Sequence, residues 1–247
     1  AIGFAGHAEG QTTLASGSVS HAEGDGTTSS GWGSHSQGAR TVSSGDYSHA
    51  GGKGFNSINK IEASGDTSFV HYNQTSASGN IGAYGDYSTI LGGTDHNIGT
   101  GSTSSGIFGG SGNTINSDIF RSIILGGGNN GIFKHIAVST VTNNIILGGT
   151  KLSGTSVSHN CALIGGENNE IFGPPMSPSV NNTIVLGGSD ITGGISNSVY
   201  VPNLNIGTVG SGPSEFNLGI DSSGFVVTGT TGGGVTLDPY NNVGSAS

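Results

Sequence analysis

The chain has 247 residues, of which 49 are glycine, and its formal net charge is −9 with no cluster of lysine and arginine. This charge argues against nucleic-acid binding, and a hydrophobic content of 32% is low for the thick core of one globular domain. The single cysteine excludes an intrachain disulfide framework. Because no apolar run has the length of a membrane span and the opening AIGFAGHAEG lacks basic and apolar signal regions, we expect neither membrane insertion nor a signal peptide.

The first segment, residues 1–93, carries a motif that recurs at every fourteenth position. Four histidines keep this interval, and so do two columns of glycines: His7, His21, His35 and His49; Gly3, Gly17, Gly31 and Gly45; Gly10, Gly24, Gly38 and Gly52. A unit this short holds two strands of about five residues and two tight turns, which is one coil of a parallel β-roll. Strand alternation places Ser20 and Ala22 inside the coil, with His21 and Glu23 on its outer face.

After Gly52 the glycine column shifts by one residue and continues at Gly65, Gly79 and Gly93. This pattern predicts further coils of the same length, with the shift absorbed by a bulge or longer turn near Asn56–Lys60. The narrow β-roll is therefore expected to extend to residue 93.

The second segment, residues 94–196, has a wider repeat in which two apolar residues precede Gly-Gly. The apolar pairs begin at positions 90, 107, 124, 146, 163 and 185, so the successive steps are 17, 17, 22, 17 and 22. A second isoleucine follows several pairs after seven residues, and asparagines crowd the intervening turns, where left-handed geometry and stacked amides are useful. The two longer steps predict loops at Gly131–Val141 and Phe172–Val180, and loops on a rigid scaffold often carry recognition.

The third segment, residues 197–247, loses the repeat. NSVYVPNLNIGTV is a strand signal, and GIDSSGFVVTGT predicts a hairpin that turns at Ser222–Gly224, followed by a connector. The predicted fold class is therefore all-β, a parallel β-roll or β-helix solenoid with 14-residue and then 17–22-residue coils. Such a narrow coil has little interior, so we expect it to associate with copies of itself.

The unit SHAEG at Ser20–Gly24, with ASG at 15–17, resembles the HAEG-type repeats of bacteriophage tail-fibre and appendage proteins. It is also similar to the 14-residue head repeats of trimeric autotransporter adhesins. The segment NSVYVPNLNIG…LGIDSSGFVVTGT resembles the region before a C-terminal assembly domain in phage fibres, although no self-cleaving domain of that kind lies within the 247 residues. The resemblance implies a homotrimeric fibre; the residues alone imply only a need for partners.

Several residues could carry chemistry, and each has a structural alternative. The histidine ladder could bind metal, but metal sites need ligands converging on one point, so we favour hydrogen bonding with Glu9 and Glu23. Asp25, Asp46, Asp66 and Asp86 could suggest a glycosidase pair, yet they stand beside turn glycines, where aspartate is expected. Cys161, although close to His159, occupies the position of Thr183 in a later coil, which indicates a small core residue.

Aromatic residues are unusual in the small-residue segment, where they could stack on host sugars or pack between subunits. The receptor-contact candidates from both segments are Trp32, Tyr47, Phe69, Tyr72, Phe133, Lys134, Phe172 and Met176. We expect no catalytic residue, no cofactor and no bound metal.

Together, these features predict a non-catalytic structural and host-attachment fibre of a phage particle. Its partners would be copies of itself, other virion proteins and a host surface glycan or protein, and its location would be the virion. Two alternatives stay open: the head of a trimeric adhesin on the bacterial surface, and a β-helical polysaccharide depolymerase.

Overall fold

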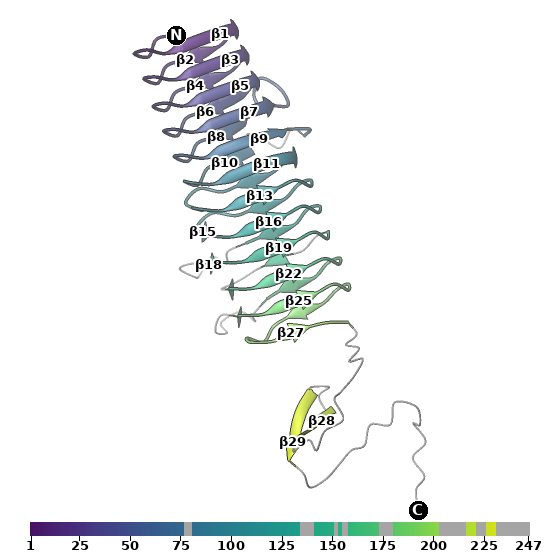
Figure 1. Cartoon of the computed structure of the whole chain (residues 1–247). Helices are drawn as coiled ribbons and strands as arrows, with labels where there is room; N and C mark the ends of the chain where they lie inside the picture. Colours follow the sequence, from purple (N-terminus) through teal and green to yellow (C-terminus); the bar gives the residue numbers. More distant parts are fainter. Residues whose placement is uncertain are drawn as a thin grey trace, which may run out of the picture. The chain divides into compact units, whose positions relative to one another are not determined.

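The computed structural model describes residues 1–76, 81–133, 141–150, 153–154, 158–172, 180–202, 216–220 and 226–230. The chain divides into two compact units, Ala1–Asn203 and Leu204–Ser247. In the first unit every described strand pairs in parallel with the equivalent strands of neighbouring coils (Figure 1), so the predicted all-β parallel solenoid is confirmed. The described residues contain no helix that is long and apolar enough to span a membrane.

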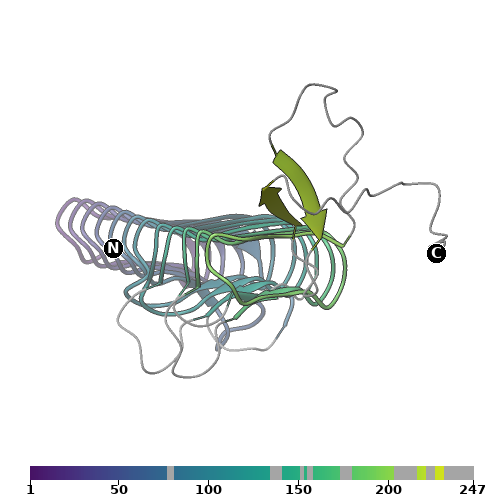
Figure 2. The same cartoon turned by 90° about the horizontal axis from the view of Figure 1, so that it is seen from below.

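Three parallel sheets form the sides of the solenoid, and Figure 2 shows the coils stacked one behind another. The long sheet has 12 described strands: β1 (His7–Gln11), β3 (His21–Asp25), β5 (His35–Ala39), β7 (His49–Lys53), β9 (Phe69–Asn73), β11 (Thr89–Thr94), β13 (Gly106–Phe108), β16 (Ile123–Leu125), β19 (Ile145–Leu147), β22 (Ala162–Ile164), β25 (Ile184–Leu186) and β27 (Val199–Tyr200). Its strands pair residue by residue in register, which keeps equivalent side chains in straight rows.

The second sheet has 11 described strands: β2 (Leu14–Ala15), β4 (Thr28–Ser29), β6 (Thr41–Ser43), β8 (Ile61–Ala63), β10 (Ile81–Ala83), β12 (Asn97–Ile98), β14 (Thr114–Ile115), β17 (Gly131–Ile132), β20 (Ser153–Gly154), β23 (Glu170–Ile171) and β26 (Thr192–Gly193). The short sheet begins only in the wider coils: β15 (Ile119–Phe120), β18 (Val141–Thr142), β21 (Ser158–His159) and β24 (Val180–Asn181). From β13 onward a coil can therefore contain three strands, whereas a coil of the histidine repeat contains two.

The interior changes along the solenoid. Ser20 and Ala22 are buried in the narrow coils while His21 and Glu23 lie on the outer face, as strand alternation predicts. In the wider coils the first residue of each apolar pair is buried, and so are the second isoleucines: Ile90, Ile107, Ile124, Ile146, Leu163 and Val185; Ile98, Ile115, Ile132 and Ile171. The predicted steps of the apolar pairs are confirmed by the register of the long sheet, in which each pair lies beside the next.

The predicted coil length was wrong for two coils. His49 pairs with Phe69 and Phe69 with Thr89, so each of these coils is six residues longer than the histidine repeat. The six additional residues lie between β7 and β8, close to the predicted turn at Asn56–Lys60, and again between β9 and β10. The glycine column after Gly45 therefore continues at Gly65 and Gly85, and the apparent column from Gly52 to Gly65 is a coincidence of spacing.

In the wider coils, asparagines connect one coil to the next. Buried Asn113 accepts a hydrogen bond on its Oδ1 from the backbone N–H of Asn130 at 3.0 Å, and its amide reaches the carbonyls of the Gly-Gly turns. Asn129 and Asn168 adopt positive φ, as predicted for turn asparagines. The amide side chains thus satisfy the turn groups of neighbouring coils.

In the second unit, β28 (Phe216–Ile220) pairs antiparallel with β29 (Val226–Thr230), so the predicted hairpin is confirmed. Its turn residues, 221–225, lie outside the described residues. The first two predicted segments both belong to the first compact unit, whose strands continue to Tyr200.

Candidate functional site

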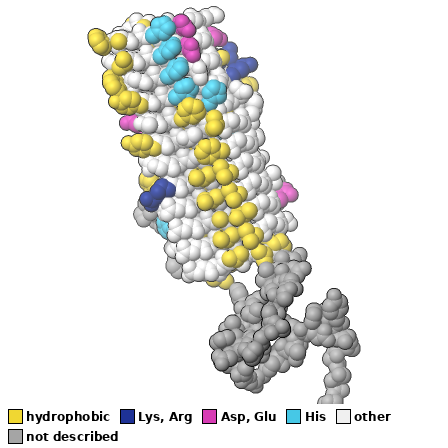
Figure 3. Space-filling model, viewed as in Figure 1, with side chains coloured by type: hydrophobic (Ala, Val, Ile, Leu, Met, Phe, Trp, Pro, Cys, Tyr) yellow, Lys and Arg dark blue, Asp and Glu magenta, His cyan; other side chains and the backbone are white. Residues whose placement is uncertain are grey.

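The outer face of the long sheet carries two straight rows of side chains, because its strands are in register and alternate residues point outward. The first row contains His7, His21, His35, His49, Phe69, Thr89, Gly106, Ile123, Ile145, Ala162, Ile184 and Val199. The second row contains Glu9, Glu23, Gln37, Gly51, His71, Leu91, Phe108, Leu125, Leu147, Ile164 and Leu186. Both rows change from polar to apolar along the solenoid (Figure 3).

The polar end of the first row is the predicted histidine ladder. Successive ring centroids from His7 to His49 are 4.7, 4.8 and 4.9 Å apart, close to the spacing of neighbouring strands. The rings of His21 and His35 stack with an interplanar angle of 5°, and His49 stacks on Phe69 at 4.8 Å. The ladder is therefore continuous with the apolar residues that follow it.

Two histidines of the ladder lie near the glutamates of the second row, but at distances too long for the predicted hydrogen bonds. His7 Nε2 lies 4.0 Å from a carboxylate oxygen of Glu9, and His35 Nε2 lies 3.6 Å from one of Glu23. Further along, the Gln37 amide lies 3.3 Å from His49 Nε2. Burial, together with the neighbouring imidazoles of His35 and His71, lowers the pKa of His49 to about 4. His49 is therefore uncharged at neutral pH.

An open groove of about 660 Å³ runs beside the ladder. Its polar side chains are Glu9, Glu23, Gln37 and His71, and its other lining residues are Gly10, Gly24, Gly38 and Gly52. An added Cβ at Gly10, Gly24 or Gly38 would overlap the carbonyl of the next glycine in the column, so close stacking of the coils requires glycine here. Figure 3 shows the histidines and acidic side chains gathered at this end of the face.

The other end of the same face is an apolar stripe, which we define as the residues of both rows from Leu91 to Val199. Leu91 is 49% exposed and Val199 is 61% exposed, and Phe108, Leu125, Ile145 and Leu186 are also exposed. The stripe follows seven strands of the long sheet, from β11 to β27. Phe69 on the preceding strand, β9, is also exposed but is not counted in the stripe. A contiguous apolar surface of this kind is a candidate interaction site.

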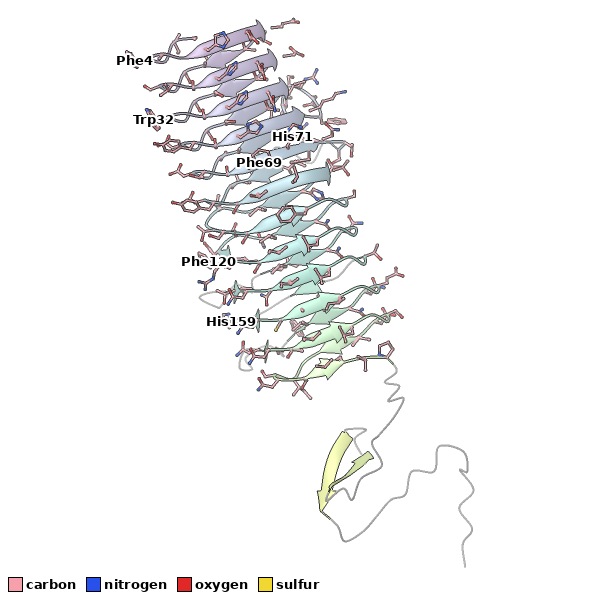
Figure 4. The ribbon with its side chains drawn as sticks, in the orientation of Figure 1. Phe4, Trp32, Phe69, His71, Phe120 and His159 are labelled. Carbon is pink, nitrogen blue, oxygen red and sulfur yellow. The ribbon has the colours of Figure 1, made fainter. Side chains whose placement is uncertain are left out.

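A second set of exposed side chains lies at the turns along one edge of the solenoid. Trp32 and Tyr47 are 45% and 60% exposed, and their rings meet edge-to-face at 4.6 Å. Phe4 is exposed at the turn position of Trp32, and Val19 and Tyr87 are exposed at that of Tyr47; Figure 4 shows Phe4 and Trp32 at the same edge. Sequence reasoning missed these three, although Phe4 precedes Trp32 by two histidine repeats. We call the four aromatic residues, Phe4, Trp32, Tyr47 and Tyr87, the aromatic corner.

The remaining receptor-contact candidates do not form one site. Phe69 and Phe133 are exposed, Phe172 is half-buried, and Lys134 and Met176 lie outside the described residues, as does most of both predicted loops. Tyr72 was the wrong choice because its side chain is only 3% exposed. It alternates with the outward Phe69 and His71, so it points into the coil, where its hydroxyl donates to the His96 carbonyl at 3.1 Å.

The acidic residues at the turns have structural contacts. A carboxylate oxygen of Asp46 accepts the Trp32 backbone N–H at 2.8 Å, and Asp66 and Asp86 accept equivalent bonds at 2.9 Å from the preceding coils. Such bonds satisfy turn backbone groups. Asp25 lies on the outside of β3, 3.5 Å from the hydroxyl of Thr12.

Cys161 is a buried core residue, as predicted. Its thiol contacts the carbonyls of His159 and Val180, and burial raises its pKa. The ring of His159 contacts the Thr142 hydroxyl at 2.9 Å through Nδ1. No protein-family model and no curated protein matches this chain.

Proposed function

We propose that this chain is a structural and host-attachment fibre subunit of a phage particle, and that it works as a parallel homotrimer. The apolar stripe carries the proposal. Burying a contiguous apolar face by contact with another protein is favourable in proportion to the area removed from water. An isolated chain leaves this face in solvent, so association supplies the cover that the solenoid cannot supply itself.

A second copy is the partner that fits the stripe best. The stripe repeats with the strand spacing of a parallel sheet, and an identical solenoid running in the same direction presents the same spacing. Such contacts close into a ring when copies are related by rotation about one axis. The number three comes from the resemblance to phage fibres and adhesin heads. With a formal charge of −9 per chain, the trimer is strongly acidic, which favours solubility over further aggregation.

Host attachment is assigned to surfaces away from the stripe. The aromatic corner presents rings that can stack on sugar faces, and the predicted loops remain candidates for contacts with host or virion proteins. Three copies per fibre would raise weak binding through avidity without new contacts. We assign no catalytic step to the chain.

A mass measurement in solution tests the assembly. The protein should have the mass of a trimer, and replacing Leu125 and Phe108 by glutamine together should shift it to monomer. Tyr87→Ser, at the aromatic corner, is the matched control and should leave the mass unchanged. A wild-type protein that remains a folded monomer at micromolar concentration would overturn the trimer.

Attachment is tested separately by competition. Purified protein should reduce adsorption of the parent phage to its host, and the double variant Trp32→Ser with Tyr47→Ser should compete less well while keeping the wild-type mass. Detection of the chain in purified particles would support the virion location, whereas detection only on bacterial surfaces would favour an adhesin. Release of sugar fragments from host polysaccharide would show that the binding-only proposal is wrong.

A further inference from the structure

Three potential metal ligands meet at the polar end of the outer face. Glu9, His21 and Glu23 come from β1 and β3, and their ligand atoms all lie within 4.8 Å of one another. The glutamate side chains line the open groove, so a small ion reaches this position from solvent. This set differs from the histidine ladder itself, whose rings follow one another in a row instead of converging.

The two carboxylates face each other across neighbouring strands. Glu9 pairs with Glu23 in register, and like charges directly opposite one another destabilise a sheet. Their ion-pair partners are the imidazoles of His7 and His35, which carry charge only when protonated. A cation between the two carboxylates would relieve this repulsion.

His21 supplies the second observation. Its Nε2 atom is shielded from solvent and has no hydrogen-bond partner among the described residues. A shielded nitrogen without a partner costs free energy, and an ion or water is the usual explanation when one occurs. The ring is held on both sides by His7 and His35, with centroids 4.7 and 4.8 Å away, so its orientation is restricted.

We propose that Glu9, His21 and Glu23 bind one divalent transition-metal ion, with Zn²⁺ as the best match. One imidazole and two carboxylates form a nitrogen and oxygen ligand set that suits zinc. Ligand atoms on a tetrahedral zinc ion lie about 3.4 Å apart, and the long glutamate side chains can close the remaining distance. Water in the groove completes the coordination.

The row pattern limits the site to one per ladder. In the next coils Gln37 and Gly51 occupy the positions of Glu9 and Glu23, so within residues 1–76 no second pair of carboxylates stands beside the ladder. The ion would connect β1 to β3. By binding only the folded form, it would stabilise the first coils by mass action.

Titration of the full chain, free of any affinity tag, with Zn²⁺ tests this inference by calorimetry. We expect one ion per chain, and we expect His21→Asn and Glu23→Gln each to weaken binding by at least about tenfold. The control is His49→Asn, which removes an imidazole from the same ladder. Beside His49 the second row carries Gln37 and Gly51 in place of glutamates. It should bind zinc like the wild type. Circular dichroism establishes that all variants are folded.

Co²⁺ gives a second readout, because its visible absorption reports tetrahedral coordination and should be lost in His21→Asn. Three results would overturn the proposal. The first is an equal loss of binding in His49→Asn, the second is a stoichiometry that follows the number of histidines, and the third is wild-type affinity in both site variants. Equal affinity for Mg²⁺ would also overturn it, because it would indicate nonspecific attraction to carboxylates. The outcome is independent of the oligomeric state, which the mass measurement determines.

Discussion

The narrow and wide coils of this solenoid are stabilised in different ways. In the narrow coils the interior is made of alanine, serine and threonine, and buried hydroxyls bond to the backbone within the coil. Ser29, for example, donates to the His21 carbonyl at 2.6 Å. In the wide coils isoleucines fill the interior, and Asn113 and Asn130 bond from coil to coil. Narrow coils therefore depend on close backbone approach, whereas wide coils depend on apolar burial and asparagine ladders.

The largest loss of stability is expected for Gly31→Val, a substitution in the narrow coils. An added Cβ at Gly31 would overlap the backbone carbonyl of Gly45, so the two coils would have to separate. We expect a loss of more than about 4 kcal/mol, enough to unfold the N-terminal coils. Gly126→Ala is the control, since its Cβ meets nothing within 4 Å and only its positive φ of 69° is unfavourable. It should cost about 1–2 kcal/mol in urea unfolding.

The wide coils should respond most to loss of apolar volume. Ile124 is fully buried, so Ile124→Ala leaves a cavity and should cost about 2–5 kcal/mol. The exposed neighbour provides the control, because Leu125→Ala removes a similar volume from a partly solvated position. Both variants are made in a background kept monomeric by glutamine substitutions in the apolar stripe at positions other than Leu125. If they lost the same stability there, the interior would not be the main source of stability.

Acid should weaken the junction between the two regions. Buried His96 occupies the ladder position of Asn113, and its Nδ1 accepts the Asn113 backbone N–H at 3.2 Å. Burial lowers the pKa of His96 to about 4, although Asp95 acts in the opposite direction. A lowered histidine pKa means that the unfolded chain binds the proton first, so stability is complete above about pH 6.5 and falls as the pH decreases toward 4.

The expected loss from His96 is up to about 3 kcal/mol, and His49 adds a smaller effect in the same pH range because it is only half-buried. His96→Asn keeps an acceptor at the ladder position and should reduce the dependence of urea unfolding on pH between 7.5 and 5. An unchanged slope in this variant would contradict the assignment.

The two interiors should also differ in how much stability they lose when a buried side chain is replaced by leucine. Ala22 is fully buried in a narrow coil, so Ala22→Leu should cost about 1–3 kcal/mol. Ile124→Leu, which conserves volume in a wide coil, should cost less than about 1.5 kcal/mol. Thermal unfolding followed by circular dichroism measures both, and an Ala22→Leu protein with wild-type melting would contradict the narrow interior.

The smallest effect is expected for Cys161→Thr. Thr183 occupies the same position one coil later, and its hydroxyl donates to the carbonyl of Asn181, as the thiol does to that of His159. We expect a change of less than about 1 kcal/mol. A larger loss in urea unfolding would indicate that the cysteine coil is packed differently from its neighbour.

The sequence by itself determined the features that repeat. The histidine and glycine columns, and the apolar pairs with their two step lengths, predicted the parallel stacking and most of the register. Strand alternation predicted that Ala22 is buried and that His21 is on the outer face. These inferences succeed because each coil pairs mainly with its neighbours, so local periodicity is also the tertiary pattern.

Only the tertiary structure decided what departs from the repeat. The length of two coils depends on where six additional residues are placed, and the spacing of Gly65 alone suggested the wrong column. The outward direction of Phe69 and His71, and the burial of Tyr72, follow from that register. The union of the histidine ladder and the apolar stripe on one face, and the meeting of Glu9, His21 and Glu23, also required the structure. Proximity across coils depends on side-chain direction and register, which residue types and spacing do not specify.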